Sequence, residues 1–118
     1  TQEAAMPSSQ SNMLRGALEL LSLKAVSREP THGYGVLEWL EKAVGEQVLV
    51  EEGTLYPALH RLEEKGWLSA SWGLSENNRR AKFYDVTPRG RERLAREGQQ
   101  WSDFAHAVMG ALDAPARS

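Results

Sequence analysis

The chain has 118 residues, the size of one small domain, and its contents of apolar (41%) and charged (25%) side chains are typical of soluble globular proteins. It contains no cysteine, which excludes disulfides, thiolate catalysis and cysteine-ligated zinc. The net charge of −2 argues against a nucleic-acid-binding protein, but residues 53–93 carry eight basic and five acidic side chains. Such a local basic region can bind phosphates although the whole chain is slightly acidic.

No apolar segment approaches the ~18 residues that a membrane-spanning helix needs. The first residues also lack the basic-then-apolar pattern of a signal peptide. We therefore expect a cytoplasmic protein without a membrane partner.

The N-terminal residues 1–12 are small and polar, and we predict a disordered tail there. A helical pattern begins at Met13, with Asn12 as a candidate N-cap, and it ends before Pro30. The apolar positions extend around much of this helix, so we expect it to pack on two sides. Its main stripe includes Leu14, Leu18 and Leu21.

Two further helices are predicted, over residues 32–44 and 52–65. Thr31 is a candidate cap for the first of them and Gly45 a plausible end. Gly66 follows the second one at the position where a left-handed cap is common.

The pattern then changes from helical to extended. Residues 67–72 alternate large and small side chains, and residues 82–86 are aromatic and β-branched, which predicts two strands. A polar, basic turn separates them, so we expect a β-hairpin. Thr87-Pro88 then begins a long helix that extends to about Leu112.

Three helices followed by a hairpin with a basic tip are typical of a winged helix-turn-helix domain. We therefore predict a mainly α (α+β) fold with a long C-terminal dimerisation helix. The predicted organisation is a tail (1–12), a DNA-binding domain (13–86), the dimerisation helix (87–113) and a second tail (114–118).

The predicted helix over residues 52–65 has two different sides. On a helical wheel its leucines form a core face, whereas small or polar residues occupy the far side and the flanks. Small residues allow DNA to approach closely, and hydroxyl or imidazole groups can contact phosphates and base edges. The alternative is an ordinary surface helix, and Glu63 and Glu64 oppose DNA contact. The candidate DNA-contacting residues are Gly53, Thr54, Tyr56, Pro57, His60 and Arg61.

The hairpin tip and Tyr34 extend this candidate surface. The tip is either a solvated turn or a wing that reaches phosphates or a minor groove. Tyr34 either packs against the first helix or donates its hydroxyl to a phosphate. The candidate residues of the tip are Asn78, Arg79, Arg80 and Lys82.

The long C-terminal helix has a heptad-like apolar seam that three short helices are not expected to cover. The simplest partner is a second copy of the chain, and a two-fold dimer would place two recognition helices about one DNA turn apart, ~34 Å. A pocket for a planar aromatic ligand between the subunits, walled by Trp101 and Phe104, is the less favoured alternative. With the first-helix leucines Leu14, Leu18 and Leu21, the candidate dimerisation residues are Leu94, Trp101, Phe104, Val108 and Leu112.

Signatures of catalysis are missing from the sequence. There is no HExxH motif, phosphate-binding glycine loop or paired-carboxylate signature, so we expect no enzyme activity and no cofactor. His60 and Glu64 could form half of a metal site, but the sequence offers no third ligand, so we expect no metal.

Three segments resemble the PadR family of bacterial transcriptional regulators: LRGALELLSLKAVSREPTHGYGVLEWL, EEGTLYPALHRLEEKGWL and RRAKFYDVTPRGRERL. The resemblance covers about residues 13–112 and favours the subgroup with a short, single C-terminal helix. It implies a bacterial, winged-helix homodimer that binds a palindromic double-stranded operator and usually represses transcription. It also implies that some relatives bind planar aromatic effectors at the dimer interface. Where many relatives have a serine cap, this chain has Glu51, which puts DNA contact at that position in doubt.

The leading hypothesis is therefore a homodimeric, DNA-binding repressor that a small aromatic effector could release. The alternative is a winged-helix module that binds another protein and no DNA, because a fold does not by itself fix a function.

Overall fold

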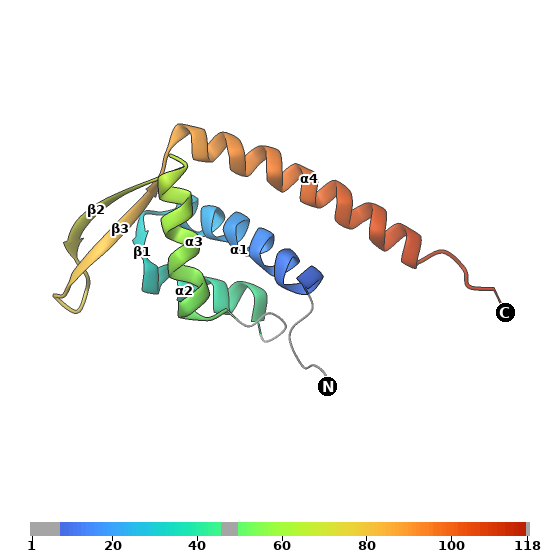
Figure 1. Cartoon of the computed structure of the whole chain (residues 1–118), viewed down its shortest axis with the longest axis horizontal. Helices are drawn as coiled ribbons and strands as arrows, with labels where there is room; N and C mark the ends of the chain where they lie inside the picture. The colour runs from blue at the N-terminus through green and yellow to red at the C-terminus, as the bar shows by residue number, and fades with distance from the viewer. Residues whose placement is uncertain (1–7, 46–49, 118) are drawn as a thin grey trace.

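The computed structural model describes the backbone of residues 8–45 and 50–117 and the side chains of residues 16–45 and 50–117. Within these ranges, the chain forms four helices with a small antiparallel sheet at one end, and the last helix extends well away from the rest (Figure 1). The elements in chain order are α1 (Ser8–Arg28), β1 (Thr31–His32), α2 (Gly33–Val44), α3 (Glu52–Glu64), β2 (Leu68–Leu74), β3 (Arg80–Val86) and α4 (Pro88–Leu112).

The first helix begins earlier than its apolar pattern predicts. α1 starts at Ser8, so Asn12 lies inside the helix instead of capping it, and residues 8–12 are not a tail. Serine and glutamine have moderate helix propensities and can extend a helix that packing has already formed. Residues 1–7 of the predicted tail lie outside the described part of the chain. As expected, α1 packs on more than one side, against α2, α3, α4 and β3.

The strand β1 was missed in the sequence because two residues have no detectable periodicity. Thr31 pairs with Tyr84 and His32 with Phe83, so the segment completes a sheet of order β1-β3-β2. The cap of α2 is consequently His32, not Thr31: its Nδ1 accepts a hydrogen bond from the Gly35 N–H at 3.0 Å.

The two predicted strands form the expected hairpin, which we call the wing (residues 68–86). Both strands extend further toward the tip than the sequence indicates. Their antiparallel pairing runs from Leu68 opposite Val86 to Leu74 opposite Arg80. The turn is therefore limited to residues 75–79. Together with the three preceding helices, this hairpin confirms the winged helix-turn-helix fold.

The end of α3 and the start of α4 are joined through the two residues predicted as caps, Gly66 and Thr87. Gly66 has a φ of +79°, the left-handed conformation expected after α3, and its N–H donates to Glu63 O at 3.0 Å. The hydroxyl of Thr87 donates to Gly66 O at 2.7 Å and accepts from the Gly90 N–H at 3.0 Å. Thr87 thus connects the end of α3 to the start of α4, which Pro88 begins.

The core lies where α1, α2 and α3 meet the base of the sheet. Leucines dominate it, as the helical patterns predict, and the four inward positions of α3 are all fully buried. The core also includes alanine and valine side chains and the aromatic ring of Tyr84 from β3. The buried residues of α3 are Leu55, Ala58, Leu59 and Leu62.

Gly90 and Gly98 on α4 offer a matched test of this packing. A Cβ on Gly90 would come within 2.1 Å of the Trp67 carbonyl oxygen, which is backbone and cannot move freely, whereas a Cβ on Gly98 would meet nothing within 4 Å. We expect Gly90→Ala to reduce the free energy of unfolding by about 1–3 kcal/mol. Gly98→Ala should increase it by about 0.5–1 kcal/mol, because alanine favours a helix. Chemical denaturation of both variants measures the two effects, and equal effects would contradict this packing.

Candidate nucleic-acid interface

The outward side of α3 is free of core contacts, as the helical wheel predicts. Its predicted DNA-contacting residues, apart from Arg61, are exposed. A Cβ added to Gly53 would meet no atom within 4 Å, so this front turn presents bare backbone to solvent. The predicted N-cap residue Glu51 makes no side-chain hydrogen bond to the helix, and the start of α3 is held by backbone bonds to its carbonyl.

Tyr56 lies across the start of α2. A Cβ on Gly33 would lie 2.2 Å from Tyr56 Cε1, so the absence of a side chain at Gly33 allows the phenol ring to lie against this backbone. Tyr56 nevertheless remains 41% exposed, and Tyr34, on the adjoining turn of α2, is 56% exposed. The two phenols predicted from separate motifs therefore lie on one surface.

A groove of about 750 Å³ runs between α2, α3 and the wing. It brings Tyr34 and Tyr56 together with Arg79 and Lys82 from the wing. The carboxylates of Glu38 and Glu76 also line it. The groove therefore contains phenol and cationic groups, which can bind phosphates. It also contains two acidic groups, which repel phosphates.

The turn at the wing tip is held by hydrogen bonds within itself. Ser75 N–H donates to Arg79 O, and Asn78 N–H donates to Ser75 O, both at 2.9 Å. Asn78 has a φ of 58°, a left-handed conformation that asparagine tolerates better than most residues. Arg79 and Arg80 are exposed, and the Arg80 guanidinium lies 5.0 Å from the centre of the Trp72 ring.

Two predicted DNA-contacting cations are paired within the protein. The Nε of Arg61 lies 2.8 Å from Glu19 Oε2, which directs this side chain to α1 and away from the groove. Lys82 Nζ lies 2.8 Å from Glu63 Oε1, and this contact raises the pKa of Lys82 above its ordinary value. We therefore leave Arg61 out of the proposed interface, whereas Lys82 stays in the groove wall with its charge partly neutralised. Sequence periodicity cannot reveal either pair, because the partners come from other elements.

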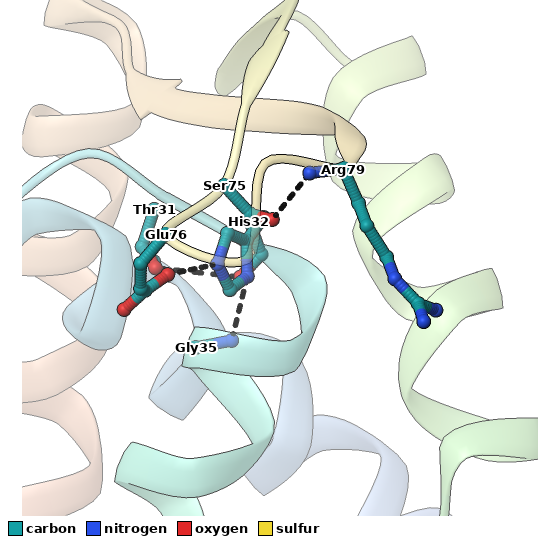
Figure 2. A network of polar contacts seen from close by, with 6 residues as sticks. All are labelled: Thr31, His32, Gly35, Ser75, Glu76 and Arg79. Carbon is teal, nitrogen blue, oxygen red and sulfur yellow. Dashed lines mark hydrogen bonds and ion pairs between the residues drawn. The ribbon is translucent and has the colours of Figure 1, made fainter.

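Two groups of this region were not predicted from the sequence: His32 at the groove and Trp72 on the wing. The His32 ring contacts the wing through Glu76, with Nε2 at 3.3 Å from Oε1 (Figure 2). His32 belongs to the same HGYG motif as Tyr34, but no local pattern indicates a contact between residues 32 and 76. Trp72, the other missed group, is 59% exposed on the wing.

Comparison with known proteins assigns the chain to a family. A family model described as "Transcriptional regulator PadR-like family" matches residues 22–96. The chain belongs to the PadR-like family. This confirms the sequence resemblance and places the chain among transcriptional regulators and not in an enzyme family.

Individual PadR-like proteins support the same assignment. The transcriptional regulator Rv3488 of Mycobacterium tuberculosis is 32% identical over 97 residues, 81% of this chain and 86% of that protein. A crystal structure of a PadR-like transcriptional regulator from Bacillus cereus is 30% identical, with a TM-score of 0.77 over 88% of this chain and 99% of that one. A PadR family regulator from Eggerthella lenta is also 30% identical, with a TM-score of 0.74 over 92% of each chain.

The last helix of this PadR-like chain carries a long exposed apolar face. Trp101 and Val108 are each 39% exposed, Phe104 is 66% exposed and Leu112 is 72% exposed. Met109, which was not predicted to belong to the face, is 56% exposed. Exposed apolar side chains in such a continuous row are typical of an interaction surface.

Other predicted dimerisation residues are used within the chain itself. Leu18 is buried in the core of its own chain, and the partly buried Leu21 and Leu94 pack against that core, so a role for these three residues in a dimer stays a prediction. α4 packs on α1, and its C-terminal part extends beyond the other helices (Figure 1). The side chain of Leu14 lies outside the described residues.

His60 Nε2 lies 3.4 Å from Glu64 Oε2, as their helical spacing predicts. Within residues 8–45 and 50–117, no three histidine or carboxylate side chains are grouped as metal ligands. None of the helices in this part of the chain has the length and apolar character needed to cross a membrane.

The ionisation of Tyr56 gives a prediction for the alkaline range. Burial of the ring, and next the Glu52 carboxylate, raise the pKa of this phenol above its ordinary value of 10.0. The stabilisation from the neutral phenol is therefore fully present below pH 10 and is lost as the pH rises through the folded-state pKa. In a spectrophotometric titration of the folded protein, Tyr56→Phe should remove a tyrosine that ionises above pH 10. A difference curve centred at or below that pH would contradict this environment.

Proposed function

We propose that this chain is a sequence-specific transcriptional repressor that binds a palindromic DNA operator as a homodimer. The observation that supports this most directly is the groove, which is lined by Tyr56 of α3, Tyr34 of α2 and Arg79 of the wing. The leucines that attach α3 to the core lie on the opposite side of the same helix. The recognition helix enters a major groove, and the wing contacts neighbouring phosphates or a minor groove.

The proposed contacts divide by chemistry. Thr54 and His60 contact base edges or phosphates from α3, and Gly53 and Pro57 keep the helix surface low enough for a close approach. Tyr34 and Tyr56 donate hydrogen bonds from their hydroxyls to phosphates. The wing contributes Asn78, Arg79 and Arg80, with Lys82 in a weaker role because of its contact with Glu63.

The dimer forms through the exposed face of α4. Trp101, Phe104, Val108 and Leu112 pack against the same face of a second chain, which covers apolar surface that one chain leaves in water. A planar aromatic effector between the subunits would stack on Trp101 and weaken operator binding. Titration with planar aromatic compounds tests for such an effector through release of DNA and quenching of tryptophan fluorescence. If no compound changes either signal, the proposed effector site is contradicted.

Selection of binding sites from random duplex DNA tests the DNA-binding function. We expect a two-fold symmetric sequence, and binding to it should weaken steeply as the salt concentration rises, because cations on the protein replace counterions on the phosphates. Failure to enrich any sequence, with no gel shift at low salt, would contradict the proposal.

A second candidate function is a protein–protein interaction module without DNA binding. The pairing of Arg61 with Glu19 and of Lys82 with Glu63 favours it, because it removes free positive charge from the predicted surface. The selection experiment separates the two functions: the module predicts no enriched DNA even at low salt.

A further inference from the structure

We propose that His32 is a positioning residue for the wing, which holds Glu76 with one ring nitrogen while the other caps α2. Through this contact it orients Arg79 toward α3. The proposal rests on the DNA-binding function proposed above, because the effect of the contact is measured as a change in affinity for DNA. It assigns a role to the first residue of HGYG that is separate from that of Tyr34.

The His32 ring is held on three sides. Its Nδ1 accepts the Gly35 N–H at 3.0 Å, so the ring proton resides on Nε2, which donates to Glu76 Oε1 at 3.3 Å. The ring also packs edge-on against Phe83 of β3, with centroids 5.2 Å apart and the planes at 67°. The side chain is 15% exposed, so little freedom remains for the ring. One imidazole therefore connects α2, the sheet and the wing turn.

Apart from the ion pair of Lys82 with Glu63, the outer part of the wing has little other support from the rest of the described chain. Its two strands extend beyond the packed base of the sheet, and Trp72 and Leu74 are 59% and 66% exposed. Two-stranded ribbons twist strongly, and isolated hairpins are marginally stable. A contact at the tip therefore has a large influence on where the wing points.

Fixing Glu76 also fixes Arg79, because both belong to the same hydrogen-bonded turn. Ser75 bonds to Arg79 through the backbone at 2.9 Å, and its hydroxyl accepts the Arg79 N–H at 3.4 Å. Figure 2 shows the two side chains on opposite sides of the turn, with Glu76 beside His32 and Arg79 extending toward α3. The contact thus holds the Glu76 carboxylate at His32 and leaves the Arg79 cation extended toward α3.

Three variants separate this role from charge and from helix capping. Glu76→Ala and Glu76→Gln remove the same negative charge, but the glutamine amide oxygen can still accept the His32 N–H. His32→Asn retains a good N-cap for α2 but is too short to reach Glu76. All three are compared with the unmodified chain in binding to the selected operator, in melting temperature, and in hydrogen exchange of the Ser75, Asn78 and Arg79 amides by NMR.

We expect Glu76→Ala and His32→Asn to weaken operator binding by about three- to tenfold and to speed exchange at the turn by a similar factor, with little change in melting temperature. Glu76→Gln should bind DNA at least as tightly as the unmodified chain. A purely electrostatic role predicts the same, tighter binding for the alanine and glutamine variants, and that result would overturn the proposal. Unchanged exchange at the turn in Glu76→Ala would overturn it as well. If the unmodified chain binds no DNA, the proposed function fails, and the exchange rates of the free protein still decide whether the contact orders the wing.

Discussion

Combined replacement of Arg79 and Arg80 by alanine is expected to lower operator affinity by about tenfold or more and to reduce its dependence on salt. Both guanidinium groups are exposed at or next to the wing turn, and neither has a carboxylate partner among the ion pairs of the described residues. Each phosphate contact that is lost should reduce the slope of log K against log salt by about 1. Titration of the selected operator at several salt concentrations measures both quantities.

The matched control for the wing removes the same charge elsewhere. Arg91 and Arg96 are exposed on α4 and do not line the groove, so the double alanine variant at these positions should retain most of the affinity and the salt slope. Equal losses in the two double variants would indicate a general effect of net charge. An unchanged slope in the wing variant would contradict phosphate contacts by the wing.

Replacement of Phe104 by aspartate is expected to convert the dimer into a monomer at micromolar concentration. Phe104 is 66% exposed in the single chain, so the change should leave the fold of each subunit intact. In the proposed dimer the side chain is buried against the partner, where loss of an aromatic contact and burial of a charge together weaken association by more than about 2 kcal/mol. Analytical ultracentrifugation measures the dissociation, and operator binding should weaken with it because a monomer binds one half-site.

A negative charge on the opposite side of α4 provides the control. Gln99 is exposed, and its side chain bonds to Asp103 at 2.9 Å, away from the apolar row. Gln99→Glu should therefore leave the dimer intact. A Phe104→Asp protein that sediments like the unmodified chain would show that α4 does not form the interface through this face.

Local patterns in the sequence were sufficient for most of the elements. The leucine spacing of α3 predicts its buried face because a helix turns ~100° per residue, and that geometry depends on no other part of the chain. The Thr87-Pro88 cap and the left-handed Gly66 were likewise predictable, because their partners are a few residues away or their backbone conformation is intrinsic. The family assignment follows from the same local motifs.

Contacts between distant segments could not be predicted in this way. The strand β1 exists because Thr31 and His32 meet the free edge of β3, and α1 neutralises Arg61 because Glu19 lies 2.8 Å from it in the folded chain. The packing of Leu94 against the core of its own chain was not predictable for the same reason, since its helical spacing shows only which side of α4 it occupies.

Some of the side chains that form the groove were thus identifiable from sequence, whereas the charge balance of the groove was not. Periodicity places a residue on a face of its own helix, but it contains no information on which residue of another element will lie opposite. Tyr34, Tyr56 and Arg79 could be proposed from motifs, and the folded chain brings them to one groove. The pairing of Lys82 with Glu63 and of His32 with Glu76 arises from the docking of the wing against the helices, because only that packing brings these distant side chains within bonding distance.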